Sequence, residues 1–365
     1  MTGKSSIAAK LKSAVDSLKS GKRSPVGDPE YLKKAARYPF WSNGAERSVP
    51  ECRTYNHVHD FLDECEIKGG HAVSPSGKIR KVLFIGFDGM RADALPHILG
   101  SSANAVTGVS GIAELGNVYL AYCGGEAGTE TEQTTSTSSC WTSHFTGVWG
   151  SEHGIKTNDD IKNMRYRTFM LEYAERGLHT AVAFDWEQYF DINLREEVKY
   201  VMANYLPMRI CDTDRVKKDK PERSYAETPE FYNFIAPDSP SASAPHDTGM
   251  RDYILGRMDA GDDIICGIFH TIDTAGHNSG FGGTEYTGAV INCDMYAHSV
   301  LQAVRRREAQ LNEEWLVVFA SDHGGIGNGH GGQTLEERTT WIATNIPFAD
   351  KYLGCGYDGY TENRG

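Results

Sequence analysis

The chain has 365 residues, 39% of them hydrophobic and 24% charged, which suits one large globular domain or a domain with a sizeable insertion. Its net charge of −12 argues against a nucleic-acid polymer as the main partner, because such binding depends on basic surface. A small phosphate ester stays compatible with this charge, since bound metal ions can dominate an acidic background locally. The longest apolar runs have the length of a strand, so no membrane-spanning segment is expected.

Residues 1–75 differ from the rest of the chain and are expected to form an N-terminal extension. Residues 7–18 have helical apolar spacing, and a second short helix is expected at 58–65. The N-terminus has no apolar core of signal-peptide length, which favours a cytoplasmic protein. The eight cysteines form no CxxC pair and are expected to be mostly reduced, while a bond between Cys52 and Cys65 stays open.

From residue 76 to residue 365, segments of strand length alternate with helical segments. Apolar runs of strand length occur at 81–87, 117–123, 179–184, 264–270, 315–321 and 338–344. Helical spacing occurs at 169–176, 248–258 and 286–308. This alternation predicts an α/β catalytic domain with a mainly parallel central sheet and helices on both faces. Charged and Pro/Ser-rich stretches interrupt it from about 186 to 246, and this span is interpreted as a cap insertion near the site.

Six Asp and His residues fall in short motifs behind the predicted strands. They are Asp88 in Phe-Asp-Gly, Asp273 and His277 in Asp-x-x-x-His, Asp322 and His323 in Asp-His-Gly, and His330 in Gly-His-Gly-Gly. The three Asp residues stand just past strand ends, the edge at which open α/β sheets bind ligands. Carboxylates and imidazoles suit Zn²⁺ and similar ions, and six of them can hold two ions. Two such ions with a hydroxyl between them form a site for in-line displacement at phosphorus.

These motifs, in this order, resemble the type I phosphodiesterase/nucleotide pyrophosphatase family of the alkaline phosphatase superfamily. The resemblance runs from about residue 81 to 347 and includes the segment that ends in Thr146-Gly147 and continues to His153-Gly154. It implies an alkaline-phosphatase-like fold and two divalent ions. Zn²⁺ is expected, and Mn²⁺ or another divalent ion stays open. The family pattern assigns Asp273, His277 and His330 to one ion, and Asp88, Asp322 and His323 to the other, with the Thr137 oxygen beside it.

The resemblance also implies a nucleophile nine residues before the Thr of the Thr-Gly pair, which is Thr137. A helix that starts at Thr137 would offer free N–H groups and a positive dipole to a phosphoryl group. A nearby ion would lower the pKa of the hydroxyl and favour its attack. Because Thr135, Ser136, Ser138 and Ser139 also carry hydroxyls, the register stays open by a residue or so.

Three further residues are candidates for substrate contacts. In the resembling nucleotide pyrophosphatases an Asn three residues past the nucleophile helps to bind the phosphoryl oxygens, and this position is Cys140 in the present chain. A thiol is a weak donor, so this departure leaves the substrate in doubt. Trp186 would stack on an organic group and His270 would line the pocket, with packing in the core as the alternative for both.

The sequence thus predicts a metal-dependent hydrolase of small phosphodiesters or nucleotide pyrophosphates. Residues 124–154 contain no Arg or Lys, whereas the dianion of a monoester needs strong charge neutralisation beyond two ions. A phosphomonoesterase or phosphonate hydrolase on the same scaffold is the alternative, and a metal-binding protein without turnover is the rival from another class. The expected partners are a small phosphate ester and no membrane, and the oligomeric state stays open.

Overall fold

The computed structural model describes residues 40–44, 47–99, 109–160, 164–186, 194, 196, 197, 200, 208–212 and 246–354. The helix predicted at 7–18 lies outside these residues, and so does most of the span predicted as a cap. Within the described ranges no helix combines the length and the apolar character that crossing a membrane requires. In the residues that the structure describes, six cysteines form no disulfide bond: Cys52, Cys65, Cys123, Cys140, Cys266 and Cys293.

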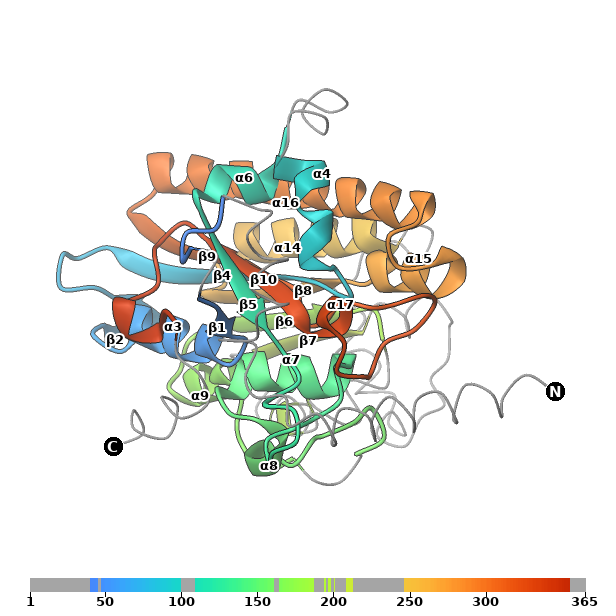
Figure 1. Ribbon diagram of the computed structural model, residues 1–365. Coiled ribbons are helices and arrows are strands. Elements are labelled where there is room, and N and C mark those ends of the chain that lie inside the picture. Colours follow the sequence, from blue (N-terminus) through green and yellow to red (C-terminus); the bar gives the residue numbers. More distant parts are fainter. Residues whose placement is uncertain are drawn as a thin grey trace, which may run out of the picture.

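In the described residues, ten strands form one mixed sheet at the centre of the molecule (Figure 1). The main path across the sheet is β1 (Val49–Pro50), β5 (Asn117–Tyr122), β10 (Thr339–Thr344), β9 (Glu313–Ala320), β4 (Ile79–Phe87), β8 (Ile264–Phe269), β6 (Thr180–Phe184) and β7 (Met208–Asp212). The strands from β9 to β7 are parallel, and β10 is antiparallel to both of its neighbours. The ribbon of β2 (Glu66–Lys68) and β3 (His71–Val73) joins the sheet at β4. The mainly parallel sheet predicted from the alternation is confirmed.

Helices cover both faces of the sheet (Figure 1). One face is covered by α4 (Pro96–Leu99), α6 (Gly111–Leu115), α14 (His246–Ala260), α15 (Thr271–Ser279) and α16 (Thr284–Gln310). The other face is covered by α3 (Arg53–Leu62), α7 (Thr137–Thr146), α8 (Gly150–His153) and α9 (Phe169–Glu175). Short elements are η1 (Ala92–Ala94), α17 (Leu335–Arg338) and η2 (Asp350–Tyr352). The helices predicted at 169–176, 248–258 and 286–308 correspond to α9, α14 and α16.

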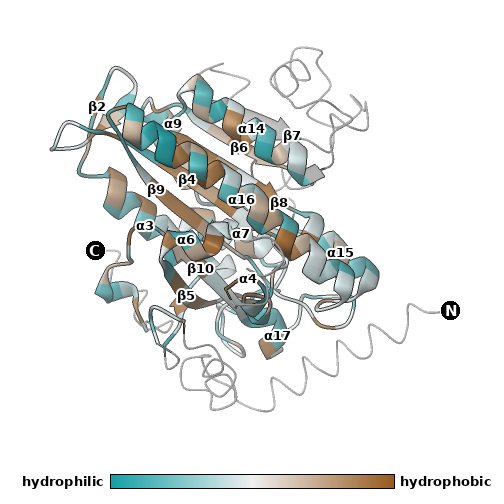
Figure 2. Ribbon diagram, turned by 90° about the horizontal axis from the view of Figure 1, so that it is seen from above, coloured by the Kyte–Doolittle hydropathy of each residue, from teal (hydrophilic) through white to brown (hydrophobic). Residues whose placement is uncertain are grey.

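The central strands are hydrophobic throughout because they supply two cores at once. In β9, Trp315 and Val317 belong to the core under α14 and α16, whereas Leu316 and Val318 belong to the core with α3, α7 and α9. Figure 2 shows β4, β8 and β9 in the hydrophobic colours, and α16 above them with hydrophilic and hydrophobic turns. Such continuous apolar runs are typical of parallel strands covered on both sides.

Parts of the sheet come from spans predicted to lie outside it. β1, β2 and β3 fall within residues 1–75, where α3 packs on α7 and α9. β7 falls within the span from about 186 to 246 and pairs in parallel with β6. The described portions of both spans are therefore joined to the central sheet.

Candidate active site

Three neighbouring parallel strands bring the acidic motifs to one edge of the sheet. β4 lies between β8 and β9, so their carboxyl ends meet at this edge. Asp88 directly follows β4, Asp322 lies two residues past the end of β9, and Asp273 lies in the first turn of α15, which begins just after β8. The topology thus gathers three carboxylates that are far apart in the sequence.

Asp88, Asp322 and His323 form the strand-end group. Their side chains are completely buried, and their candidate ligand atoms lie within 4.8 Å of one another. His323 Nε2 is 3.6 Å from Asp88 Oδ1 and 3.4 Å from Asp322 Oδ2. The other carboxylate oxygens are held, because the Trp141 indole N–H donates to Asp88 Oδ2 and the Gly89 backbone N–H donates to Asp322 Oδ1, both at 3.1 Å. Each carboxylate is fixed through one oxygen and presents the other to His323.

Asp273, His277 and His330 form the helix–loop group. The Asp-x-x-x-His spacing puts Asp273 and His277 on one face of α15, with His277 Nε2 3.2 Å from Asp273 Oδ2. His330 comes from the glycine-rich loop after β9, and its Nε2 lies 3.7 Å from Asp273 Oδ1 and 3.1 Å from His277 Nε2. His270 approaches the same carboxylate, with its Nε2 3.7 Å from Asp273 Oδ2. Asp273 is buried, whereas His277 is exposed.

The three candidate ligand histidines are oriented in the same way. The Nδ1 atom of each lies beside a backbone carbonyl, and the pairs are His277 with Asn328 at 3.0 Å, His323 with Gly324 at 2.8 Å and His330 with Thr135 at 2.9 Å. A proton on Nδ1 donates to that carbonyl, which leaves the Nε2 lone pair facing the carboxylates. Proteins commonly fix the tautomer and ring direction of metal-binding histidines in this manner.

The carboxylates retain buried oxygens without a hydrogen-bond partner. They are Asp88 Oδ1, Asp322 Oδ2 and Asp273 Oδ1, and each faces a histidine Nε2. A buried acceptor without a partner costs about 1–3 kcal/mol, and more when it is charged. A divalent cation in each group would satisfy the carboxylate oxygens and the imidazole lone pairs together, so the residues fit two metal ions.

Without a cation, bound protons stabilise part of the buried charge of the two groups. Burial and the Asp273 charge raise the pKa of Asp88 to about 7, and burial with the Asp88 charge raises the pKa of Asp322 well above 3.8. The hydrogen bond with Asp273 raises the pKa of His277 to about 9. Burial alone would raise the pKa of Asp273, but the neighbouring imidazoles of His270 and His277 lower it well below 3.8. A cation would therefore displace protons as it binds.

Thr137 is the first residue of α7, as the sequence predicts, and its side chain is buried. Its Oγ1 lies 3.4 Å from His323 Nε2, which places the hydroxyl beside the strand-end group. Two neighbouring hydroxyls are engaged elsewhere: Thr135 Oγ1 donates to the Gly332 carbonyl, and Ser136 Oγ pairs with Ser139 Oγ. Among these hydroxyl residues, Thr137 is the one that lines the cavity described next.

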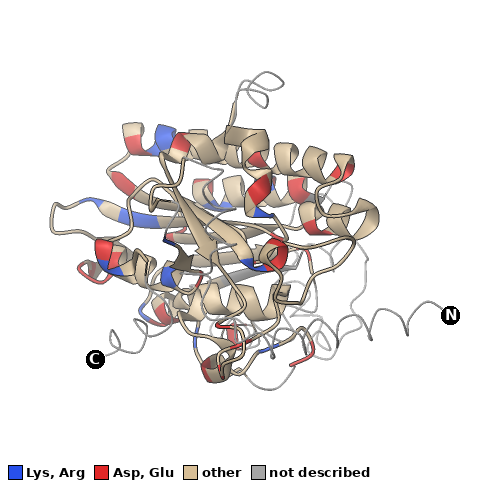
Figure 3. Ribbon diagram, viewed as in Figure 1, with Lys and Arg blue, Asp and Glu red and all other residues tan. Residues whose placement is uncertain are grey.

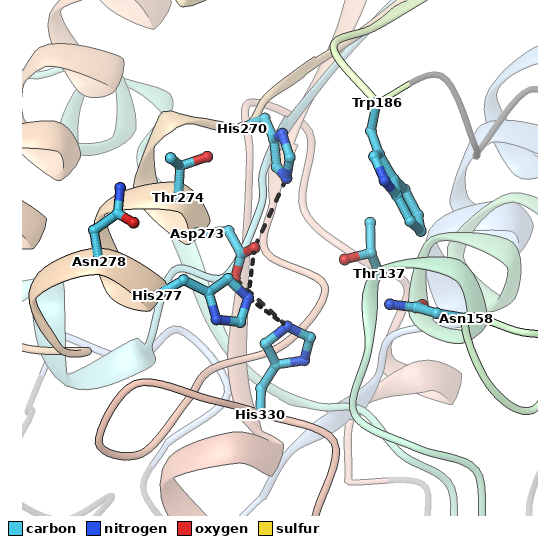
Figure 4. A pocket seen from close by; sticks show the side chains of 9 residues that line it. All are labelled: Thr137, Asn158, Trp186, His270, Asp273, Thr274, His277, Asn278 and His330. Carbon is cyan, nitrogen blue, oxygen red and sulfur yellow. Dashed lines mark hydrogen bonds and ion pairs between the residues drawn. The ribbon is translucent and has the colours of Figure 1, made fainter. Parts of the chain in front are cut away.

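A cavity of about 290 Å³ lies in front of the two groups, and Figure 4 shows it between α7 and α15. Its lining residues are Thr137, Asn158, Trp186, His270, Asp273, Thr274, His277, Asn278 and His330. Across the cavity, Thr137 and Trp186 face Asp273, and they also face the helix–loop histidines His277 and His330. Two of the predicted contact residues, Trp186 and His270, thus line the cavity.

Three lining residues were missed by sequence reasoning. Asn158 accepts a hydrogen bond from the Ser138 backbone N–H at 2.9 Å, in the first turn of α7, and its amide is turned toward Thr137 (Figure 4). Thr274 and Asn278 lie one turn apart on α15. Their positions next to Asp273 and His277 in the sequence are a signal that would have found them, whereas Asn158 lies in a loop without such a pattern.

Cys140 is not brought to the cavity. Its side chain is completely buried, and its thiol donates to the Thr134 carbonyl at 3.6 Å. It lies with Glu51 and Cys123 in the protein interior. Cys140 is one helical turn past Thr137, so it lies farther from the N-terminal end of α7 that borders the cavity. The expected contact between Cys140 and substrate is therefore corrected, and Asn158 is the residue beside Thr137.

Comparison with known proteins finds a family match over most of the chain. The model of the type I phosphodiesterase / nucleotide pyrophosphatase family matches residues 82–343, which is most of the chain. The matched segment contains both groups and Thr137. No curated protein matches the sequence.

Solved structures match this chain at low sequence identity, and one of them reaches a TM-score of 0.50. Alkaline phosphatase from the Antarctic bacterium TAB5, as a variant with Mg bound in its M3 site, is 11% identical with a TM-score of 0.50, covering 76% of this chain and 94% of that one. Murine ectonucleotide pyrophosphatase/phosphodiesterase 5 is 17% identical with a TM-score of 0.40, covering 67% and 57%. Phosphonoacetate hydrolase from Sinorhizobium meliloti is 15% identical with a TM-score of 0.42, covering 69% and 59%. The alkaline-phosphatase-like fold predicted from the motifs is confirmed.

Proposed function

The chain belongs to the type I phosphodiesterase/nucleotide pyrophosphatase family, and we propose that it hydrolyses small phosphodiesters or nucleotide pyrophosphates with two divalent ions. The observation that supports this most directly is the set of three orphaned carboxylate oxygens, each facing a histidine Nε2, next to the Thr137 hydroxyl. A hydrolase of phosphoric esters needs cations and a nucleophile at one place. Here the carboxylates and imidazoles would be the ligands of the cations, and the Thr137 hydroxyl would be the nucleophile.

The two groups would each hold one ion. The helix–loop group would hold the first and the strand-end group the second, with Thr137 Oγ1 beside it. The mixed carboxylate and imidazole donors suit Zn²⁺ and also admit Mn²⁺. When bound, the ions would supply charge for the phosphoryl oxygens and lower the pKa of the Thr137 hydroxyl and of a water molecule.

The residues of the chain would perform the remaining work. Thr137 Oγ1 attacks phosphorus, the alcohol or nucleotide departs, and water then releases the phosphoryl group from Thr137. The N-terminus of α7 offers backbone N–H groups to the negative phosphoryl oxygens. The Asn158 amide donates to the same oxygens, in the role that sequence reasoning gave to position 140.

Charge favours a diester over a monoester. The three carboxylates of the two groups and two divalent cations leave one formal positive charge, which matches the single negative charge of a diester. The described lining of the cavity has no Lys or Arg to neutralise a second charge, and α7 contains no Lys, Arg, Asp or Glu (Figure 3). Trp186, Thr274 and Asn278 provide a surface for the organic group of a diester.

The decisive experiment compares a diester with a monoester on metal-supplemented enzyme. We expect kcat/KM for a nucleoside p-nitrophenyl monophosphate to exceed that for p-nitrophenyl phosphate by at least about tenfold. The second negative charge of the monoester would leave a net negative charge in a buried site, which is unfavourable. The same assay after removal of metal by a chelator provides the control. A preference for the monoester would favour a phosphomonoesterase, and hydrolysis of a phosphonate alone would favour a phosphonate hydrolase.

A further inference from the structure

Helix α15 carries two of the proposed ligands, but its own N-terminus is not capped from within. His270, at the N-cap, makes no side-chain capping bond. Without a partner, the first backbone N–H groups of a helix remain unsatisfied, and the first turn frays. Asp273 lies in this first turn, so its position depends on what holds the turn.

The missing cap comes from another helix. Asp247, in the first turn of α14, accepts the His270 backbone N–H at 3.0 Å through Oδ1 and the Thr271 backbone N–H at 3.3 Å through Oδ2. The thiol of Cys293, on α16, donates to the same Oδ2 at 3.1 Å. The Asp247 side chain is 4% exposed, so water does not readily replace these bonds. Asp247 therefore joins three helices that cover one face of the sheet (Figure 1).

We infer that Asp247 is a positioning residue for the helix–loop group: it caps α15 from α14 and thereby fixes Asp273 and His277 around their ion. The inference rests on the two-ion proposal above. Asp247 is absent from the cavity lining, so its effect on turnover is indirect, through the ion that α15 binds. The strand-end group does not depend on it, because Asp88, Asp322 and His323 follow β4 and β9.

The test is the Asp247→Asn variant, which keeps the shape but replaces one acceptor oxygen with an NH₂ donor. We expect one of the two Zn²⁺ ions to bind about 10–100-fold more weakly, the range typical for residues that support metal ligands. Competition with a chromophoric chelator measures both affinities. Turnover should return toward wild type at saturating Zn²⁺, since Asp247 touches no reacting group.

Asp252→Asn is the matched control, because Asp252 lies on the same helix with an exposed side chain paired to Arg251. It should leave both affinities unchanged. In the His277→Ala background, adding Asp247→Asn should not weaken the remaining ion any further, because both changes act on the same group. Weakening of both ions to the same degree, or unchanged affinities in a less stable protein, would show a general structural role and overturn the inference.

If Asp247→Asn does not fold, Asp247→Glu serves, since it keeps the charge and both oxygens on a side chain one methylene longer. We expect a smaller loss of affinity for the same single ion, and equal affinities in Asp247→Glu and wild type would again overturn the inference. Failure of the two-ion proposal looks different. In that case the wild-type protein itself would bind fewer than two ions.

Discussion

The strand-end group and the helix–loop group use the same kinds of side chain but are built differently. The strand-end residues are completely buried and follow β4 and β9, the two most extensively paired neighbours in the sheet. The helix–loop residues lie on α15 and in a glycine-rich loop, and His277 is exposed. The position of the first group is set by the sheet itself, whereas the second depends on supports such as Asp247 and Thr135.

The two groups also differ in how they tolerate the absence of metal. In the strand-end group, burial raises the pKa of both carboxylates, with the Asp273 charge adding to the shift at Asp88 and the Asp88 charge adding to it at Asp322, so protons bind to carboxylates. In the helix–loop group, the proton binds to His277 and pairs with Asp273. The strand-end group thus holds closely spaced buried carboxylates that a cation would stabilise, whereas the helix–loop group pairs its carboxylate with a protonated histidine.

Thr137→Ala separates catalysis from metal binding and should have the largest effect. We expect kcat to fall by at least about 10³-fold, since removal of a nucleophile commonly has effects of this size or larger. Both ions should remain, because the carboxylates and imidazoles provide most of the affinity. Steady-state kinetics with metal analysis of the same sample measures both. A variant with near-normal turnover would show that the nucleophile is another residue.

Replacing one carboxylate in each group probes the contrast directly. Asp322→Asn and Asp273→Asn should each lose one ion and reduce kcat/KM by more than about 100-fold, beyond the usual effect of a supporting residue. Without metal, the two substitutions should change the free energy of unfolding in opposite directions. Asp322→Asn removes a buried carboxylate that repels Asp88 and should stabilise the fold, whereas Asp273→Asn leaves His270 and His277 without their partner and should destabilise it.

Thermal unfolding after chelation measures this difference, with each variant compared with wild type under the same conditions. Shifts of the same sign and size in both variants would mean that the two groups respond to metal loss alike.

Thr135→Val tests the support of the helix–loop group from the nucleophile segment. Thr135 Oγ1 donates to the Gly332 carbonyl at 2.7 Å and accepts from the Gly331 N–H at 3.1 Å, beside the Thr135 carbonyl that His330 Nδ1 contacts. Valine keeps the shape but loses both bonds, so one ion should bind about tenfold more weakly.

Thr135→Ser keeps the hydroxyl and should restore the affinity, and it is therefore the matched control. At saturating metal both variants should turn over normally, in contrast to Thr137→Ala. Loss of turnover in Thr135→Val with both ions fully bound would instead favour Thr135 as the nucleophile.

The sequence was most informative where residue type and strand pattern coincide. Asp88 and Asp322 follow apolar runs that stop abruptly, so both the strands and the edge that gathers the carboxylates could be predicted. Asp247 could not be found in this way, because its bonds go to backbone N–H groups of a helix more than twenty residues later. Such a contact leaves no periodic pattern.

The remaining errors have similar physical causes. Cys140 was expected at the cavity because spacing along the chain was taken for spacing in the site, but α7 carries it into the core. Asn158 reaches Thr137 through a loop whose course no local pattern specifies. β7, with the sequence Met-Arg-Ile-Cys-Asp, is short and only partly apolar, so it was not distinguished from the predicted cap around it.

His59 offers the smallest effect and the sharpest contrast with the site histidines. Its Nδ1 lies 3.0 Å from Asp63 Oδ2 and its Nε2 lies 3.1 Å from Glu172 Oε2, so both ring nitrogens face carboxylates. This environment suits a doubly protonated imidazolium, whereas the site histidines direct Nδ1 to a carbonyl and Nε2 to a carboxylate of the proposed metal groups. Burial alone would lower the pKa of His59, but the neighbouring carboxylates of Glu172 and Asp63 outweigh it and raise the pKa above 6.5.

Because the folded state binds this proton more tightly than the unfolded state, the stabilisation is fully present below about pH 6.5 and is lost as pH rises through the raised pKa. His59→Gln should therefore lower the free energy of unfolding at acidic pH by about 0.5–1 kcal/mol, the size expected of a partly exposed ion pair. The difference from wild type should shrink with increasing pH in denaturant titrations. Metal content should not change, since His59 has no free Nε2 lone pair to offer. A difference that stays constant with pH, or a loss of one ion, would mean that this histidine does not differ from those of the site in the way its contacts indicate.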